Sequence, residues 1–269
     1  MGERANGTAS WEELSIIRID ESRRYRRSDR LIREEAYTLY INEQRIYTFA
    51  CTPIDLEDLA AGYAFAEGFF NSKAEIQSLS VDRDAQEIRL SLFSFFSNFS
   101  NLPKENFSKE KEKIESLSSE YFSKEKNSEE KNEKNEKFKK EKIYALWEIF
   151  NEKSNLFHIT GAVHAMALTD SDTILILRED AARHNAAAKT IGRMVLGELD
   201  PAGKAFMFSG RLSLNLCRMV ERTGVKVLLC HGAVTSSAVR QAEAAGITLA
   251  GFLRRGYMNI YSHSGRITD

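Results

Sequence analysis

A chain of 269 residues is long enough for one large domain or two modest ones. Its net charge of −1 and pI of about 6.6 lack the basic excess of a nucleic-acid-binding protein, so we expect no nucleic-acid partner. No apolar run approaches the ~20 residues that a membrane-spanning helix needs, and the first residues lack the apolar core of a secretory signal. We therefore expect a cytoplasmic protein without a membrane span.

The first 97 residues predict a small β-rich subdomain with one helix. Apolar and polar residues alternate in Tyr37–Cys51 across an Asn-Glu turn, as in a β-hairpin. In residues 52–70 apolar side chains recur at helical spacing, with polar capping residues before them and a glycine near the end. Residues 76–93 predict a second hairpin.

Residues 98–142 lose this pattern, because lysine and glutamate dominate there. Such a segment buries too little apolar surface to offset the entropy of ordering it, which is ~1–2 kcal/mol per residue for the backbone alone. We interpret 98–142 as a charged, mobile insertion. A charged helix supported by Glu–Lys pairs and a binding surface for a partner are the alternatives.

Residues 143–269 predict an α/β domain with a mainly parallel sheet. Apolar, strand-like runs alternate there with helical stretches, and three of the helical stretches end on glycine, as in βαβ units. The strand-like runs are apolar throughout, which is typical of a sheet that is covered on both faces. Because ligands of such sheets bind at the strand ends, we expect the ligand site of the chain in this part, and the family resemblance given below makes it a nucleotide or cofactor site.

Ligands of open α/β sheets bind beyond the carboxyl ends of the strands, and four such ends here carry cations, hydroxyl groups and glycines. If the sheet is parallel, these ends share one edge, where guanidinium groups and the free N–H groups of helix starts suit an anionic ligand with phosphates. Taken singly, the arginines could be solvated side chains, His184 a capping residue and Ser209-Gly210-Arg211 a plain turn. His164 lies in an apolar run, which is typical of a core histidine. The four ends hold Arg178, Arg183 and His184; Ser209, Gly210 and Arg211; His231–Thr235; and Arg254, Arg255, Gly256 and Tyr257.

The three cysteines, Cys51, Cys217 and Cys230, are scattered and odd in number, so the sequence does not predict a disulfide framework. Because no C-x-x-C pair occurs anywhere, we expect no structural metal. Cys51 at a strand end and Cys217 on an apolar helix are typical of core thiols. Cys230 precedes His231, whose imidazolium could lower the thiol pKa and make Cys230 a nucleophile. Neighbouring strand residues point to opposite faces, however, which favours a core role for Cys230 too.

Five segments of the chain resemble the FdhD family of formate dehydrogenase accessory proteins. Together these segments cover most of the chain outside the charged tract, and their order and spacing match those of the family. The resemblance implies a cytidine-deaminase-like, three-layer α/β domain with an added N-terminal β-rich part, and a homodimer. The segments are Thr52–Phe70, Thr160–Leu168, Arg178–Gly192, Ser209–Val220 and Gly246–Ser262.

The same resemblance implies a cytoplasmic sulfurtransferase or sulfur carrier in molybdenum cofactor biosynthesis. Such a protein takes sulfur from a cysteine desulfurase as a persulfide and passes it to the molybdenum bis(molybdopterin guanine dinucleotide) cofactor of formate dehydrogenase; GDP would mimic part of that cofactor. By the resemblance, the helix start Arg183-His184-Asn185 and the turn Ser209-Gly210-Arg211 match segments near the nucleotide site. The family's cofactor-binding segment maps onto Phe252, Leu253, Arg254, Arg255, Gly256 and Tyr257.

The chain departs from the family pattern where the sulfur chemistry would occur. The family carries a C-x-x-C on a loop equivalent to about Leu117–Lys142, and this region contains no cysteine here. A thiolate forms the persulfide, and neither serine nor lysine can replace it. The family's S-A-P-T reads Gly232-Ala233-Val234-Thr235, and its E-D-V-G-R-H has alanine at Ala182 in place of glycine, which could reshape the pocket.

Two functions therefore stay open. The chain is either an accessory protein that binds the cofactor and takes part in its sulfuration, or a non-catalytic paralogue or chaperone that binds the guanine nucleotide or the cofactor. In the first case Cys230 is the one candidate nucleophile. A zinc deaminase, which the implied fold suggests, is disfavoured because the H-x-E…P-C-x-x-C signature is absent.

Overall fold

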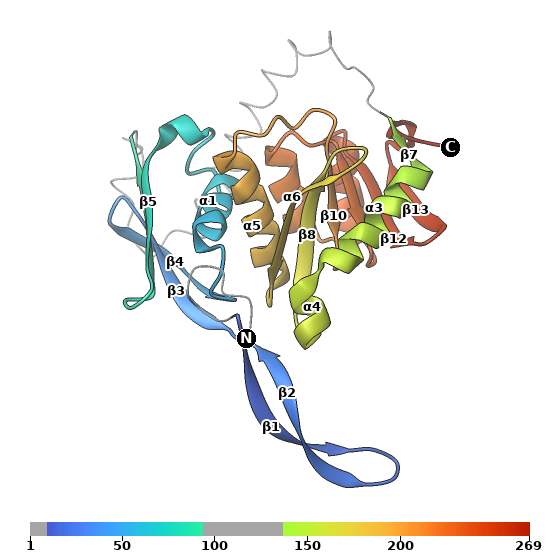
Figure 1. Ribbon diagram of the computed structural model, residues 1–269. Helices are drawn as coiled ribbons and strands as arrows, with labels where there is room; N and C mark the ends of the chain where they lie inside the picture. Colours follow the sequence, from blue (N-terminus) through green and yellow to red (C-terminus); the bar gives the residue numbers. More distant parts are fainter. Residues whose placement is uncertain (1–9, 94–136) are drawn as a thin grey trace. The chain divides into compact units, whose positions relative to one another are not determined.

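The computed structural model describes residues 10–93 and 137–269 (Figure 1). Most of the charged insertion predicted at 98–142 lies outside these residues. Its last six residues are described, and they correct the predicted boundary: Phe138–Lys139 form strand β7, and helix α3 begins at Lys140. Phe138 is buried in the same core cluster as Ile143. Regular structure therefore begins again at Phe138, before the lysine-rich sequence ends.

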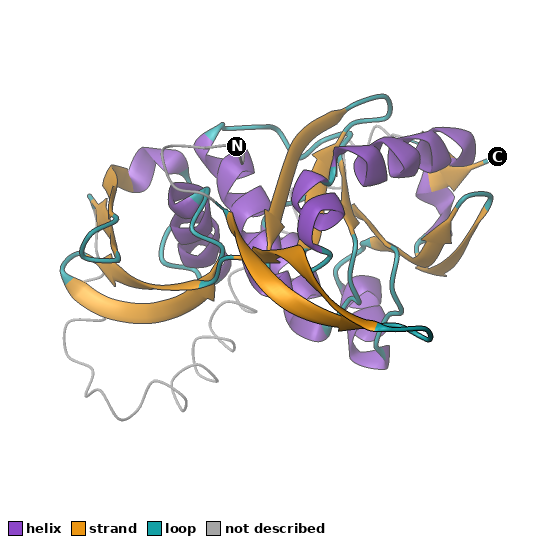
Figure 2. Cartoon of the chain, turned by 60° about the horizontal axis from the view of Figure 1, so that its bottom comes forward, coloured by secondary structure: helices purple, strands orange, loops and turns teal. Residues whose placement is uncertain are grey.

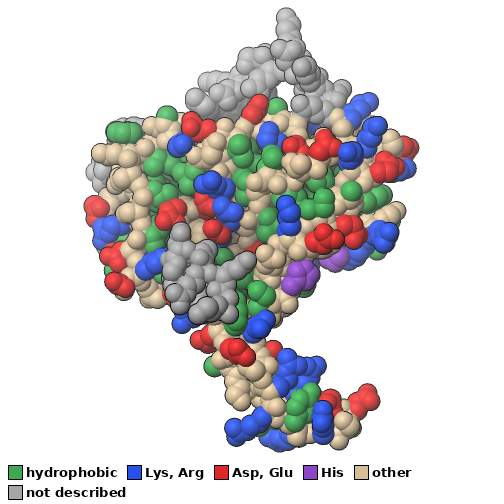
Figure 3. Space-filling view, in the orientation of Figure 1, with side chains coloured by type: hydrophobic (Ala, Val, Ile, Leu, Met, Phe, Trp, Pro, Cys, Tyr) green, Lys and Arg blue, Asp and Glu red, His purple; other side chains and the backbone are tan. Residues whose placement is uncertain are grey.

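A β-hairpin that the sequence pattern did not predict comes first. Strands β1 (Trp11–Ile19) and β2 (Arg24–Ile32) pair antiparallel with each other and with no other described strand. Figure 3 shows basic side chains gathered at the far end of this hairpin, where Arg23, Arg24 and Arg26 are exposed. Neither strand alternates cleanly between apolar and polar residues, so the hairpin buries little of its surface.

The predicted N-terminal β-rich part with one helix is confirmed. Strands in the order β4-β3-β6-β5 form a four-stranded sheet in which the two predicted hairpins, β3–β4 and β5–β6, are joined by a parallel β3–β6 pair. Helix α1 follows β4, and a short 3₁₀ turn, η1, precedes β5. The bounds are β3 Glu35–Ile41, β4 Gln44–Cys51, α1 Leu56–Ala66, η1 Lys73–Glu75, β5 Ile76–Asp82 and β6 Glu87–Leu92.

The α/β part contains a six-stranded sheet in the order β13-β12-β11-β10-β8-β9. Separately, β7 pairs parallel with β14 (Ile267–Thr268), which follows the 3₁₀ turn η2 (Ser264–Arg266). The strands are β8 His164–Thr169, β9 Ile174–Asp180, β10 Ala205–Phe208, β11 Val227–Cys230, β12 Thr248–Arg254 and β13 Tyr257–Ser262. The helices are α3 Lys140–Lys153, α4 Asn155–Thr160, α5 Arg183–Leu196, α6 Leu214–Arg222 and α7 Ser236–Ala244.

The direction of the strands refines the prediction of a mainly parallel sheet. Strands β10, β11 and β12 pair parallel, whereas β8 pairs antiparallel with both β9 and β10, and β13 pairs antiparallel with β12. Because β9 and β10 are both antiparallel to β8, the four strands β9–β12 all run in one direction. Their carboxyl ends therefore meet at one edge of the sheet, as the prediction requires.

Helices cover both faces of the six-stranded sheet, which gives the predicted three-layer α/β class (Figures 1 and 2). The register places Ala167, Met207, Leu229 and Ala250 side by side on one face, and all four belong to a core cluster with residues of α3. Helices α5 and α7 contact the sheet as well, and α5 also contacts α1 and α6. No described helix is both long and apolar enough to cross a membrane.

Helices α1 and α5 cross at two glycines, and this crossing joins the N-terminal part to the α/β part. A Cβ atom added to Gly62 would lie 1.8 Å from the carbonyl oxygen of Ala188, and one added to Gly192 would lie 1.8 Å from that of Asp58. Only residues without a side chain allow backbones this close. The residues predicted as separate domains, 1–97 and 143–269, therefore pack as one compact unit over their described portions.

Candidate functional site

The loops after β9, β10, β11 and β12, together with the start of β8, form one edge of the sheet, which we call the rim. Hydrogen bonds join the loops directly: the Gly232 N–H donates to the carbonyl of Gly210 at 3.2 Å, and the Phe252 N–H donates to the carbonyl of Gly232 at 3.0 Å. A Cβ on Gly232 would lie 2.6 Å from the Gly210 oxygen, so a glycine is required there. The predicted strand ends are thus brought together.

Two arginines at the rim act electrostatically on His164, the first residue of β8. Burial lowers the pKa of His164, and the positive charges of Arg183 and Arg211 lower it further. Arg183 is the first residue of α5, and Arg211 lies two residues before Ser213, the N-cap of α6. Among the described residues, neither guanidinium has a carboxylate partner in hydrogen-bond or ion-pair range. We call His164, Arg183 and Arg211 the His164 cluster; its arginines were predicted from sequence, whereas its histidine was interpreted as a core residue.

Two polar atoms at the helix starts of the rim lack partners. Nε2 of His184 and Oγ of Ser213 are buried and make no hydrogen bond within the described part of the chain. Burial lowers the pKa of His184, and Arg183 lowers it further. Buried polar groups are nearly always hydrogen-bonded, so two such atoms beside the free N–H groups of helix starts are expected where a ligand or ordered water supplies the missing bonds.

A second group of rim residues lies on the α3 face of the sheet. Nη1 of Arg254 donates to the carbonyl oxygens of His231 and Leu253, at 2.5 and 2.9 Å, and lies 2.7 Å from Nδ1 of His231. Nδ1 of His231 also lies 3.1 Å from the carbonyl oxygen of Leu253, so this nitrogen contacts both a donor and an acceptor. Burial lowers the pKa of His231, and Arg254 lowers it further. Trp147 of α3 stacks on its ring.

The predicted cofactor-binding segment, Phe252–Tyr257, divides into exposed and buried residues. Phe252 and Tyr257 are exposed large side chains, and Arg255 and Gly256 form the exposed turn between β12 and β13. Leu253, by contrast, is fully buried in the core cluster under α3 and has no surface for a ligand to touch. Phe252 has φ 54, a left-handed conformation that an aromatic residue rarely adopts.

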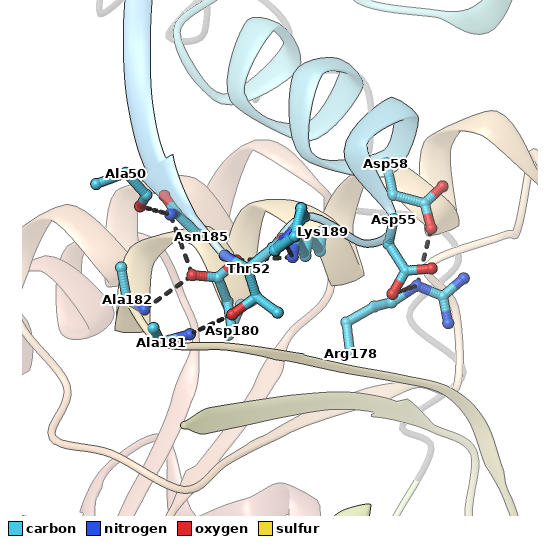
Figure 4. Close-up of polar contacts among 12 residues, drawn as sticks. Ala50, Thr52, Asp55, Asp58, Arg178, Asp180, Ala181, Ala182, Asn185 and Lys189 are labelled. Carbon is cyan, nitrogen blue, oxygen red and sulfur yellow. Dashed lines mark hydrogen bonds and ion pairs between the residues drawn. The ribbon is translucent and has the colours of Figure 1, made fainter. Parts of the chain in front are cut away.

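Arg178 and Asn185 are not free to bind a phosphate, contrary to what their places in the sequence predicted (Figure 4). Nε of Arg178 donates to Asp58 at 2.8 Å and lies 3.5 Å from an oxygen of Asp55, both at the start of α1. The side-chain amide of Asn185 donates to the carbonyl of Ala50 and to the carboxylate of Asp180 at the end of β9. Asp58 and Ala50 are 120 and 135 residues away from the side chains they bind, and a local sequence pattern cannot reveal such partners.

Ser209 and Ala182 also have structural explanations. The Oγ of Ser209 accepts from the Ala165 N–H at 2.9 Å, so this hydroxyl fastens the loop after β10 to β8. Ala182, which stands where the resembled family has glycine, has φ −99 and ψ 127. Any residue adopts this extended conformation, so the alanine places no strain on the loop. The reshaping that we considered possible for this substitution does not arise from the backbone.

All three cysteines are buried and unpaired by disulfides. The pKa of each thiol is raised to about 12, and burial is the largest cause at Cys51, Cys217 and Cys230 alike. The Cys230 thiol donates to the carbonyl of Gly232 at 3.1 Å, whereas His231 turns to the opposite face and stacks on Trp147. A nucleophilic thiol needs an accessible, stabilised thiolate, and Cys230 has neither feature.

The fold and the rim define an α/β protein with cations gathered at the carboxyl ends of its strands. A sequence model of the FdhD/NarQ family matches residues 32–268, and the chain belongs to this family. It is 33% identical over 258 residues to the sulfur carrier protein FdhD of Halalkalibacterium halodurans, which spans 94% of this chain and 93% of the relative. It is 30% identical over 262 residues to that of Saccharolobus solfataricus, which spans 95% and 98%.

A solved structure has the same fold. The crystal structure of a candidate formate dehydrogenase accessory protein from Desulfotalea psychrophila matches with a TM-score of 0.76 and covers 96% of this chain and 99% of that chain. The two sequences are 20% identical, so this likeness concerns the fold alone.

Proposed function

We propose that this chain is an accessory protein for formate dehydrogenase that binds the guanine nucleotide part of the molybdenum cofactor at the rim. The observation that carries the proposal is that Arg183 and Arg211 stand at the starts of α5 and α6 on the rim, with no carboxylate from the described residues to neutralise them. Guanidinium groups at helix starts suit phosphates, which accept charge-assisted hydrogen bonds from them. The partnerless Nε2 of His184 and Oγ of Ser213 fit the same role.

The residues at the rim fit a guanine dinucleotide in two respects. Arg183, Arg211 and the helix starts would hold its phosphates, and the exposed rings of Phe252 and Tyr257 offer flat surfaces for a purine. When bound, the cofactor would supply the molybdenum centre that accepts sulfur. The chain's own residues would bind and orient the nucleotide.

Calorimetry with GDP tests this proposal. We expect GDP to bind, and the Arg183→Ala/Arg211→Ala double variant to lose about 1.5–3 kcal/mol of binding free energy for each charge-assisted hydrogen bond removed. Arg26→Ala, on the exposed hairpin, is the matched control and should leave the affinity unchanged. A wild-type protein that does not bind GDP, or a double variant with wild-type affinity, would refute the rim as a nucleotide site.

We further propose that the chain delivers or holds the cofactor without itself carrying sulfur. Relatives of this chain are named sulfur carrier proteins, but its three thiols are all buried. Incubation with a cysteine desulfurase and ³⁵S-labelled cysteine decides between the two roles. No label on the chain supports the binding role, whereas label on Cys230 would restore the sulfurtransferase. A cytoplasmic location, a homodimer and a cysteine desulfurase partner remain predictions of the family resemblance.

A further inference from the structure

Asp180, the last residue of β9, lies at the centre of a buried polar network (Figure 4). Its side chain is 0% exposed, and so is that of Lys189, whose Nζ lies 2.7 Å from Oδ2. Oδ2 also accepts from the Thr52 N–H at 3.1 Å, and Nζ of Lys189 donates to the Thr52 carbonyl at 2.9 Å. A buried carboxylate persists only when it is paired and hydrogen-bonded, and this one meets both conditions.

The other oxygen of this carboxylate fastens the backbone around the rim cations. Oδ1 of Asp180 accepts from the Ala182 N–H at 2.8 Å and from the side-chain amide of Asn185 at 3.2 Å. These two residues stand immediately before and after Arg183 and His184. One oxygen atom therefore holds both ends of the segment that presents the guanidinium and the imidazole to the rim.

The same network reaches the N-terminal sheet. The Asn185 amide donates to the carbonyl of Ala50 at 2.7 Å, and the Ala181 N–H donates to Oγ1 of Thr52 at 3.2 Å. Strand β4 and the loop that follows it are thus bonded to the β9–α5 turn and to the first turn of α5. Because α5 has no side-chain cap at Ala182, these contacts hold its start in place while its first N–H groups stay available to a ligand.

We propose that Asp180 and Asn185 are positioning residues that fix Arg183 and His184 in the orientation in which they bind an anionic ligand. This inference rests on the nucleotide site proposed above. In a purely structural role, Asp180 and Asn185 would affect only the stability of the fold. Here they affect ligand binding through Arg183 and His184, whose side chains make no hydrogen bond to the network.

The principal test is Asn185→Ala, which removes the bonds to Asp180 and Ala50 without leaving a charge buried. A lost hydrogen bond is worth a factor of about three to ten in an equilibrium constant. We expect GDP to bind about threefold to tenfold more weakly, as measured by calorimetry. Asp58→Ala, which removes the side chain that accepts from Arg178 of β9, is the matched control and should lower stability without changing the GDP affinity.

A second variant tests the carboxylate itself. Asp180→Asn alone strands the buried charge of Lys189, so the neutral double variant Asp180→Asn/Lys189→Met is used. It should also bind GDP more weakly while keeping a cooperative unfolding transition. Should it fail to fold, Asn185→Ala alone decides the matter.

A double-mutant cycle separates positioning from general loosening. In an Arg183→Ala/His184→Ala background, Asn185→Ala should have no further effect on GDP affinity, because the residues it positions are gone. An equal loss of affinity in both backgrounds would overturn the proposal. So would an unchanged affinity in Asn185→Ala accompanied by a lower melting temperature.

An NMR titration of the His184 imidazole distinguishes failure of this inference from failure of the nucleotide site. If Asn185 holds the first turn of α5, Asn185→Ala lets water reach His184 and its pKa rises toward the ordinary value. An unchanged titration would overturn the positioning role even if wild-type protein binds GDP. If wild-type protein does not bind GDP, the nucleotide site is wrong, and this titration alone decides whether Asn185 positions His184.

Discussion

Trp147 and His231 stack with their ring planes 11° apart and their centroids 5.1 Å apart. Trp147 lies on α3 and is nearly buried, whereas His231 follows β11 at the rim. The stack therefore connects the helix that covers one face of the sheet to the loop that carries a candidate ligand group. Together with the contact of Nδ1 with Nη1 of Arg254, it fixes the orientation of the imidazole.

Replacing Trp147 by alanine should destabilise the protein by about 3–5 kcal/mol, because it removes a large buried side chain and both of its ring contacts. Urea unfolding followed by circular dichroism measures the change. Phe157→Ala provides the comparison, since Phe157 is 50% exposed and its loss should change stability by no more than about 0.5 kcal/mol. Equal effects of the two substitutions would contradict the packing described for α3.

The crossing of α1 and α5 makes a second prediction. Gly62→Ala should destabilise the protein by about 3 kcal/mol or more, since the new methyl group would overlap backbone atoms of Ala188 and Gly192. Gly265→Ala is the matched control, because an added Cβ there meets nothing within 4 Å, and it should be nearly neutral. Thermal unfolding of the two variants gives the answer, and a stable Gly62→Ala would show that the helices are farther apart.

The common edge of β9–β12 was predictable from sequence because it follows from local patterns. Apolar strands followed by helices that end on glycine imply repeated crossovers in one direction, and their loops then share an edge. For this reason Arg183, Ser209, Gly210, Arg211 and Arg254 all lie at the rim. The antiparallel partners β8 and β13 alter the sheet without moving that edge.

Residues with partners far away in the chain could not be assigned from sequence. Arg178 and Asn185 look like free polar groups near a strand end, but their partners are 120 and 135 residues away, on α1 and β4. His164 was interpreted as a core residue because it lies in an apolar run, but it stands at the start of β8 on the rim. The β1–β2 hairpin escaped prediction because its arginines interrupt any alternation.

The lowered histidine pKa values predict a loss of stability on acidification. For His164, His184 and His231, burial lowers the pKa of the folded state below the ordinary 6.5. The unfolded chain then binds more protons than the folded chain as the pH falls below 6.5, so their contribution to stability is full above that pH and is lost as the pH falls through the folded pKa values.

The contribution of His184 can be isolated by substitution. The pH dependence of the unfolding free energy, measured between about pH 7.5 and pH 5.5, should be shallower in His184→Gln than in the wild type. Asp58 and Glu179, whose pKa values burial raises, give the opposite slope, but they are common to both proteins and cancel in the comparison. A steeper profile for His184→Gln would mean that the folded state raises the pKa of this imidazole rather than lowering it.

The buried thiols predict an unreactive protein. At pH 8 the folded chain should react with Ellman's reagent far more slowly than a free thiol, because burial raises the pKa of each cysteine to about 12 and covers the sulfur. In guanidinium chloride all three cysteines should react at once. Rapid labelling of one thiol in the folded protein would identify an accessible nucleophile and reopen the sulfurtransferase role.

Phe252 offers a prediction in which stability and binding change in opposite directions. Its left-handed backbone costs a residue other than glycine roughly 1–2 kcal/mol, and its ring is 37% exposed, so the core gains little from it. Phe252→Gly relieves the strained backbone and should leave the melting temperature unchanged or slightly higher. If the ring stacks on the guanine base at the rim, the same substitution should weaken GDP binding by about 1–3 kcal/mol. Calorimetric affinity and thermal unfolding of this one variant separate the two effects: a lower melting temperature with unchanged affinity would mean that Phe252 serves packing and that the base is held elsewhere.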